Sequence, residues 1–440
     1  MQYYRLRHQY HSIQLLTVKK MEEEKKEEEK REVWIRSWGA GTDGQLGTGK
    51  EQDEWLPQFV PSLATLAISS ISCGGAHALA LLRGGGVVSW GRGKSGQLGH
   101  GDSESIIKPK LIKSLENIVI CCMSAGWSHS AFVSECGQLF TCGDGTFGQL
   151  GLGHFDSQHF PCKVLAFETK HVSMVSCGMR HTLVLAKGIS DSSVFAFGSA
   201  RHGQLGAAAS CQNLNGPNSS RKEARCINIP VRVKDLDIQN VVFICANGDH
   251  SSALTENGHL YVWGKGFDGN SDISVPMLAT TTLRFCQVAL GWNHGMVLTD
   301  DGKAYMWGGS HHGKLSMKKE NMMKADSNVL GCLSTCDLFK DELQLRKTNG
   351  QVGDSLAFQR ISLLGETKIK QIAAGAEHSA IILENEVVMT WGWGEHGQLG
   401  LGSTCDYQCP QTVSISIPSR DDQNNHAVYC GSGFTFALRF

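Results

Sequence analysis

The chain has 440 residues, with 41 Lys and Arg against 42 Asp and Glu. This near-neutral balance gives no electrostatic reason to expect a protein that coats nucleic acid or a membrane surface. No segment holds the 18 uncharged apolar residues that a membrane-spanning helix needs. With 51 Gly and 9 Pro, the composition instead suits many short strands joined by tight turns.

The first 32 residues differ from the rest in their charge pattern. Residues 19–32 read KKMEEEKKEEEKRE, in which Glu and Lys are spaced to pair at i,i+4 on a helix. We predict a solvated helix or a disordered tail for residues 1–32. No secretory signal peptide is recognisable there, so we expect a cytoplasmic or nuclear protein whose 16 Cys stay reduced and mostly buried.

From residue 33 onward the chain is built from seven similar units. In each unit an aromatic or small residue followed by Gly stands six residues ahead of a second Gly, usually the first of Gly-Gln-Leu-Gly. The leading residues are Trp38, Trp90, Cys142, Phe197, Trp263, Trp307 and Trp391, and the second glycines are Gly44, Gly96, Gly148, Gly203, Gly269, Gly313 and Gly397. The first three units are spaced at 52 residues, and a period near fifty is typical of a repeat architecture.

Each unit carries a second landmark, which reads small-Gly-x-x-His followed by an apolar run. The His positions are His77, His129, His181, His250, His294 and His378, and the seventh unit has Phe434 in their place. Polar links such as Asn257-Gly258 and Asp301-Gly302 then lead into the next aromatic-Gly strand. These dipeptides between apolar runs predict hairpins, so the two strands should be antiparallel neighbours.

A single unit of this kind cannot bury its own sheet faces, whereas seven sheets arranged radially can. We therefore predict an all-β fold, a seven-bladed β-propeller over residues 33–440. The chain begins with one half of a hairpin and ends with the other half. We expect residues 33–38 to pair with residues 433–440 and to close the ring. Polar insertions at about 208–226 and 316–366 should fall in loops.

The repeated residues are interpreted as scaffold. The glycines Gly44, Gly96, Gly148, Gly203 and Gly397 should permit a tight turn, with the following Leu plugging the space between blades. Six His related by rotation cannot converge on one metal ion, so we expect each to be buried and to bond to neighbouring backbone. Phe434 in the seventh position agrees with that interpretation.

No constellation of catalytic residues stands out from the pattern. The phosphate-loop-like Gly91-Arg-Gly-Lys-Ser95 lacks its first Gly, because Val88 stands there. The pairs Cys332-x-x-x-Cys336 and Cys405-x-x-x-Cys409 have an unusual spacing for zinc. We predict no catalytic residue, no metal site and no cofactor.

Specificity should lie at positions where the repeat is fixed but the residue varies. One set stands directly before the turn glycine and supplies the candidate partner face: Arg201, His202, Phe267, Asp268, His311, His312, Glu395 and His396. The other set stands two residues before each His and includes the aromatic residues Trp127 and Trp292. A mixture of charge, His and aromatic residues suits a protein-binding face. Ordinary variation in solvated loops is the alternative.

The units W-G-x-G-x-x-G-Q-L-G and small-G-x-x-H-[ST] resemble the regulator of chromosome condensation repeat, over about residues 33–440. The founding member of that family catalyses nucleotide exchange on the small GTPase Ran and binds nucleosomes through a basic tail, whereas residues 1–32 here are mixed in charge. Residues 373–400, with Trp391-Gly-Trp393-Gly-Glu395-His396, are similar to the secretion-regulating exchange-factor-like branch. The resemblance implies a protein partner of the small-GTPase class, bound without covalent chemistry. A non-catalytic scaffold, including one in ubiquitin-ligase or chromatin-associated assemblies, is the alternative.

A plant branch of the same family is a UV-B photoreceptor, whose chromophore is a cluster of Trp from Gly-Trp-Arg-His-Thr motifs in consecutive units. This chain has only Gly126-Trp127-Ser-His129 and Gly291-Trp292-Asn-His294, three units apart. The positions between them hold Met179 and Gly248. We therefore expect no neighbouring indoles, and UV-B sensing is the less favoured alternative.

Overall fold

The computed structural model describes residues 34–188, 192–206, 225–236, 239–266, 271–309, 358–363, 367–415 and 426–439. These residues form seven antiparallel sheets of four strands each. We number six of the sheets as blades 1 to 6 in chain order and call the seventh, which contains the first and the last described strands, the closing blade. The fold is the predicted seven-bladed β-propeller.

The closing blade consists of β27 (His426–Cys430), β28 (Phe434–Arg439), β1 (Trp34–Gly39) and β2 (Glu54–Phe59), and blade 1 of β3 (Ile68–Cys73), β4 (His77–Leu82), β5 (Val87–Gly91) and β6 (Ile106–Leu111). Blade 2 consists of β7 (Ile120–Ala125), β8 (His129–Ser134), β9 (Leu139–Gly143) and β10 (Gln158–Lys163), and blade 3 of β11 (His171–Cys177), β12 (His181–Lys187), β13 (Ser192–Ser199) and β14 (Cys226–Arg232). Blade 4 consists of β15 (Val241–Asn247), β16 (His250–Thr255), β17 (Leu260–Gly264) and β18 (Ile273–Leu278), and blade 5 of β19 (Phe285–Leu290), β20 (His294–Thr299), β21 (Ala304–Gly308) and β22 (Gln359–Arg360). Blade 6 consists of β23 (Ile369–Ala374), β24 (His378–Leu383), β25 (Val388–Gly392) and β26 (Tyr407–Thr412). Short helical turns, α2 (Pro61–Ala64), η1 (Lys113–Leu115) and η2 (Leu165–Phe167), connect three of the blades to the next.

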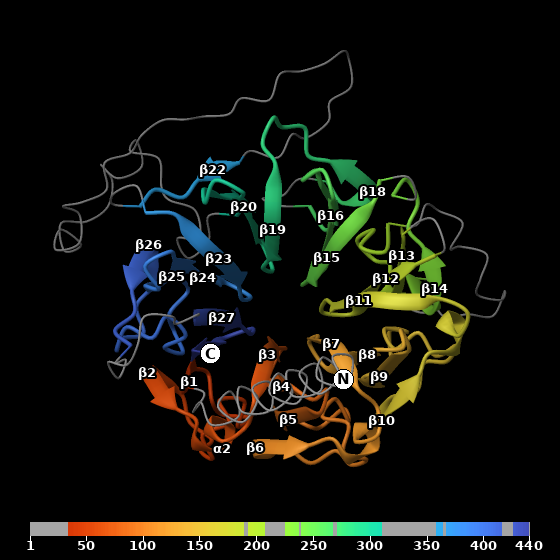
Figure 1. Cartoon of the computed structure of the whole chain (residues 1–440), viewed down its shortest axis with the longest axis horizontal. Coiled ribbons are helices and arrows are strands. Elements are labelled where there is room, and N and C mark those ends of the chain that lie inside the picture. The colour runs from red at the N-terminus through yellow and green to blue at the C-terminus, as the bar shows by residue number, and fades with distance from the viewer. Residues whose placement is uncertain are drawn as a thin grey trace, which may run out of the picture.

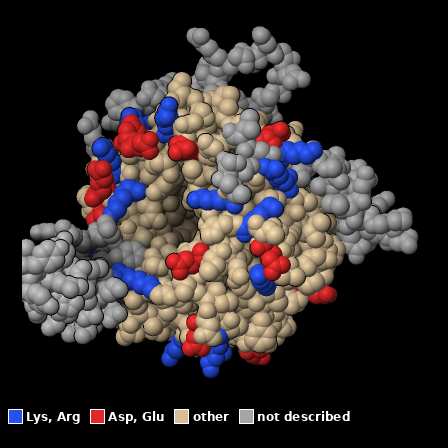
Figure 2. Space-filling view, turned by 45° about the vertical axis from the view of Figure 1, so that its right-hand side comes forward, with Lys and Arg blue, Asp and Glu red and all other residues tan. Residues whose placement is uncertain are grey.

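The first strand of each blade lies nearest the centre and the fourth lies at the periphery (Figure 1). The inner strand of a blade packs against the first two strands of the preceding blade, as β11 does with β7 and β8, and β23 with β19 and β20. The surface is hollowed at the centre of the ring (Figure 2). A hollow therefore lies at the centre of the ring, and we call this hollow the channel and its opening the channel mouth (Figure 2).

The ends of the chain close the ring as predicted. Strand β1 pairs with β28 in an unbroken antiparallel register from Trp34 opposite Arg439 to Gly39 opposite Phe434. The closing blade thus takes two strands from each end of the chain. This pairing removes an open sheet edge from both ends at once.

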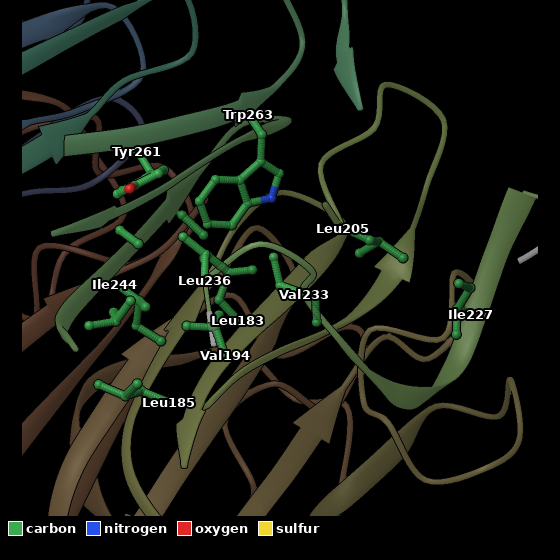
Figure 3. Close-up of a cluster of buried hydrophobic side chains, with 14 residues drawn as sticks. Leu183, Leu185, Val194, Leu205, Ile227, Val233, Leu236, Ile244, Tyr261 and Trp263 are labelled. Carbon is green, nitrogen blue, oxygen red and sulfur yellow. The ribbon is translucent and has the colours of Figure 1, made fainter. Parts of the chain in front are cut away.

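The hydrophobic core is divided among the boundaries between blades. One cluster joins Leu183 and Val194 of blade 3 to Ile244 and Trp263 of blade 4 (Figure 3). Leu205, from the Gly-Gln-Leu-Gly turn of blade 3, packs into the same cluster with 1% of its surface exposed. Because each core needs two blades, no blade buries its apolar faces alone.

Prolines protect the outer edges of the sheets, a feature that the sequence reasoning missed. Six outer strands carry Pro at one equivalent position: Pro57, Pro109, Pro161, Pro230, Pro276 and Pro410. Proline has no N–H, so it prevents another strand from pairing along that edge. Their spacing of 52 residues over the first three units was a readable signal.

The two predicted insertions fall largely outside the described residues, which resume at 225 and at 358. The sequence analysis placed the end of each insertion too far along the chain. Cys226 is already the first residue of β14, and Gln359–Arg360 form β22. Phe358 stands where other blades have Pro, and its ring packs 5.5 Å from that of Trp307. Residues 1–33, which include the predicted tail, also lie outside the described part of the chain.

Hydrogen bonds from the repeated His connect successive blades. In five links the imidazole Nε2 lies 2.9–3.0 Å from the hydroxyl that follows the corresponding residue of the next blade: His77 with Ser130, His129 with Thr182, His181 with Ser251, His294 with Ser379, and His378 with Thr435. In the third link the Ser251 hydroxyl donates to the Gln204 carbonyl at 2.8 Å, so the imidazole must supply the other proton from Nε2. The indole of Trp263 donates to the same carbonyl at 2.9 Å.

The expected bond from His to neighbouring backbone was therefore wrong for these five residues. It holds for His250, whose Nε2 lies 2.6 Å from the Trp292 carbonyl oxygen, because Gly295 stands where a hydroxyl would be. At the seventh boundary both partners are replaced, and Phe434 packs in one apolar cluster with Ala78. Each departure from the His–hydroxyl pair is thus matched by a change in its partner.

Burial lowers the pKa of five repeated imidazoles and so keeps them neutral. It lowers the pKa of His77, His181 and His378 to about 3, and that of His129 and His250 to about 4. A neutral ring can donate from Nε2 without carrying charge into the core.

We predict that the link between His181 and Ser251 behaves as a coupled unit. Ser251→Ala should cost about 1–3 kcal/mol of unfolding free energy, because it leaves a buried N–H without its acceptor. Adding His181→Phe to Ser251→Ala should lower the unfolding free energy by less than His181→Phe does in the native chain. The reason is that the double variant copies the apolar pair of Phe434 and Ala78. Denaturant unfolding of both singles and the double measures this coupling. As a matched control, His181→Phe combined with Thr435→Ala lies at two separate boundaries and should be additive; additivity of the first pair would contradict the link.

We also predict that acid destabilises the ring well above the range where carboxylates titrate. Unfolded His binds a proton near pH 6.5, whereas the buried imidazoles bind one only near pH 3–4; they are those of His77, His129, His181, His250 and His378. The stabilisation that these neutral imidazoles give to the folded state is therefore complete above pH 6.5 and is lost as the pH falls. Each should remove about 1.4 kcal/mol by pH 5.5. Denaturant unfolding at pH 7 and 5.5 checks this, and equal unfolding free energies at the two values would contradict it.

Candidate functional site

The two variable sets of residues lie on one face of the propeller, which we call the His face. Strands β4 and β5 are antiparallel with His77 opposite Gly91, so the loop before the His and the turn after the aromatic-Gly strand share one end of the sheet. The Arg92 amide donates to the Ala76 carbonyl at 2.8 Å between them. The corresponding bond recurs in blades 2 to 6 and in the closing blade. The loops before the His form an inner ring around the channel mouth, and the turns form an outer ring.

Backbone hydrogen bonds hold the inner ring together. Trp127 N donates to Gly178 O at 3.3 Å, Trp292 N to Ala376 O at 2.9 Å, and Ser432 N to Gly74 O at 3.1 Å. Similar bonds join the loops at three further boundaries, and the contact of His250 with the Trp292 carbonyl serves the remaining one. The side chains of this ring therefore project from a fixed frame.

Trp127 and Trp292 meet at the channel mouth. Their ring centroids are 5.2 Å apart, with 52° between the ring planes. The expectation of separate indoles was wrong, because blades 2 and 5 face each other across a narrow mouth and the side chains are long enough to bridge it. Trp127 remains 38% exposed, and Trp292 is half-buried.

Glycines in adjacent blades make room for both indoles. A Cβ at Gly75 would lie 2.9 Å from the Trp127 ring, and one at Gly248 would lie 3.2 Å from the Trp292 ring. Gly75 and Gly248 occupy the same register position as the two Trp. The alternation of Trp and Gly at this position is visible in the sequence, but it does not reveal that the two indoles contact each other.

The outer-ring candidates divide into exposed and engaged side chains. Arg201 and Glu395 are exposed. His202 Nδ1 lies 2.8 Å from the Asp272 carboxylate, and His396 Nδ1 lies 3.0 Å from that of Asp53. Phe267, Asp268, His311 and His312 lie outside the described residues.

The two His–Asp contacts are equivalent and connect neighbouring blades. Asp53 and Asp272 each precede the outer strand of the blade that follows the His. The second oxygen of each carboxylate accepts a turn amide of its own blade, from Gly41 at 2.9 Å and from Gly266 at 3.1 Å. The imidazoles therefore support the turns, and the exposed Arg201 and Glu395 beside them face solvent.

Further polar side chains lie at the mouth, directly before the His of blades 2 to 6, where blade 1 has Ala76. The sequence reasoning did not single out this position. The Arg180 guanidinium lies 4.9 Å from the centre of the Phe147 ring. Asn293 donates to Glu377 at 2.9 Å and accepts from Lys265 at 3.4 Å. Basic and acidic side chains alternate over the surface around the hollow (Figure 2). Neither positive nor negative charge dominates this surface.

The described residues contain no group of three or more His, Cys, Asp or Glu that could hold a metal ion. Burial raises the pKa of the Cys177 and Cys430 thiols to about 12, which makes them poor nucleophiles. Within the same residues, no helix is long and apolar enough to cross a membrane.

Comparison with known proteins agrees with this architecture. Over 89% of the chain and 68% of the relative's length, it is 29% identical to the ultraviolet-B receptor UVR8 of Arabidopsis thaliana. Over 91% of the chain and 82% of the relative, it is 28% identical to the secretion-regulating guanine nucleotide exchange factor of Mus musculus. The solved structure of Prp20p from Saccharomyces cerevisiae, which binds Gsp1p and histones, superposes with a TM-score of 0.72. That similarity covers 93% of this chain and 92% of Prp20p at 22% identity, and it shows the fold.

A family model for the RCC1-like domain matches residues 34–437, which span every blade described above. The turn motif, the His strand and the closing blade all lie within the match. The chain belongs to the RCC1-like domain family.

Proposed function

We propose that this protein is a protein-binding propeller that engages its partner with the His face and uses Trp127 and Trp292 as the central anchor. The observation that carries the proposal is the contact of two indoles at the channel mouth, where neither is needed for a turn or a blade core. Large aromatic side chains on a rigid frame are the residues that most often dominate binding energy at protein interfaces.

We further propose that the partner is a small GTPase and that binding promotes nucleotide exchange. The relationship to the mouse exchange factor supports this partner class. Exchange needs no covalent step, because a protein that binds the nucleotide-free GTPase more tightly than the loaded one shifts the equilibrium toward nucleotide release. The fixed inner ring and the exposed outer turns offer a surface for such selective binding.

The test is a pull-down of small GTPases in nucleotide-free, GDP-bound and GTP-bound states. We predict preferential capture of one nucleotide-free GTPase and release on addition of GTP. Trp127→Ala with Trp292→Ala should weaken capture by about tenfold or more, since hot-spot truncations cost 2 kcal/mol or more. Phe160→Ala, which removes an aromatic residue 54% exposed on the outer strand of blade 2, should leave capture unchanged. Capture that ignores the nucleotide state would indicate a scaffold, and full capture by the Trp variant would contradict the anchor.

The indole contact also favours a second candidate function, absorption of UV-B. Indoles this close couple electronically, and the chain is related to a UV-B receptor. Ser128 and Asn293 replace the Arg of the receptor's motif, which speaks for the first candidate. A receptor should lose or gain partner binding on UV-B irradiation, and Trp127→Phe should abolish that response. Binding that is identical before and after irradiation would exclude this function.

A further inference from the structure

A second aromatic surface lies on the rim of the His face, where blade 6 meets the closing blade. We call it the corner and define it by Trp393, Glu395, His396, Asp53 and Trp55. The Trp393 and His396 ring centroids are 5.2 Å apart, and His396 Nδ1 lies 3.0 Å from the Asp53 carboxylate. Trp55 lies against the turn that follows, since a Cβ on Gly397 would stand 2.6 Å from its Cδ1 atom. These contacts join Trp393, His396, Asp53 and Trp55 into one surface, and the exposed Glu395 stands directly before His396 in the turn.

The corner presents apolar area to solvent. Trp55 is 52% exposed, and its neighbour Leu56 is 51% exposed. Trp393 is half-buried, so part of a second indole also reaches the surface. Exposed aromatic residues of this size are costly to leave in water and often mark interaction sites.

The repeat does not require these indoles. Other blades carry small, polar or aliphatic residues in place of Trp55: Ile107, His159, Asn228, Ser274 and Gln408. The residues in place of Trp393 are Ala40, Arg92, Asp144, Ser199, Lys265 and Gly309. Among the described residues, the two positions are both Trp only at this boundary. The propeller therefore does not need an indole at either position in order to fold.

Carboxylates belong to the corner itself and to the chain directly beside it. Glu395 is exposed, Asp53 is half-buried, and the exposed Glu51 stands two residues before Asp53. Lys50, the residue before Glu51, is already paired with Glu54 at 3.3 Å. An approaching cation would thus meet carboxylates beside an open indole face.

We propose that the corner binds an arginine-containing basic segment of a partner protein. A guanidinium can stack on the indole of Trp55 while its N–H groups pair with the carboxylate of Glu395. Both interactions favour Arg over Lys, because the planar guanidinium stacks and pairs at the same time. The proposal does not depend on which protein occupies the channel mouth.

The test uses the full chain and a fluorescently labelled arginine-rich peptide of twelve residues, with binding measured by anisotropy. Peptides of the same length with every Arg replaced by Lys or by Gln serve as probes of the chemistry. We expect the Arg peptide to bind most tightly, the Lys peptide about threefold to tenfold more weakly, and the Gln peptide not measurably. Trp55→Ala and Glu395→Gln should each weaken the Arg peptide by about fivefold.

Two matched variants separate the corner from general surface effects. Phe160→Ala removes an exposed aromatic residue from another outer strand, and Glu104→Gln removes an exposed carboxylate from the segment ahead of β6. Both should bind the Arg peptide like the native chain. Should Trp55→Ala lower the thermal midpoint, Trp55→His introduces the residue found at that position in blade 2 and should show the same loss of binding.

Three results would overturn the proposal. One is equal binding of the Arg and Gln peptides. Another is full affinity in Trp55→Ala, which would reduce the effect to unspecific charge attraction. The third is concentration-dependent self-association that Trp55→Ala removes, without peptide binding, which would make a second copy the occupant. The GTPase pull-down can succeed or fail independently of all three.

Discussion

The ring depends on a hydrogen-bond chain in which a buried imidazole donates to a hydroxyl of the next blade and that hydroxyl donates to the carbonyl of a turn glutamine. In one such chain His181, Ser251 and Gln204 come from two blades, and the indole of Trp263 donates to the same carbonyl. The donors and acceptors meet only when neighbouring blades are packed. Strand register, turn geometry and the neutral state of the imidazole therefore stabilise one another.

A frame of this kind leaves the tips of its loops free to vary. The backbone bonds around the channel mouth fix where each inner-ring side chain starts, whatever residue occupies the position. Trp127, Trp292 and Trp55 stand where the repeat tolerates Gly, Met or Ser, and they lie on the same face of the propeller. Function is accordingly expected where the repeat is irregular, while its regular residues maintain the shape.

Most of the fold was predictable because spacing along the chain reports the repeat directly. The turn at Gly96, the strand at His129 and the pairing of Trp34–Gly39 with Phe434–Arg439 all follow from the pattern. The partner of each His was not predictable, because it depends on the register between blades and not within one. The contact of Trp127 with Trp292 depends on the width of the channel mouth, which no local pattern encodes. The prolines of the outer strands were visible but were not recognised.

The central claim is that the seven blades form one cooperative unit that is closed by its ends. Calorimetry of the full chain against a chain that ends at Gly433 tests this most directly, since the truncation removes β28 and with it the partner of β1 and β27. The account predicts one transition for the full chain and a lower midpoint for the whole ring after truncation, with no part melting at the original temperature. A transition that persists unchanged in the truncated chain would contradict it.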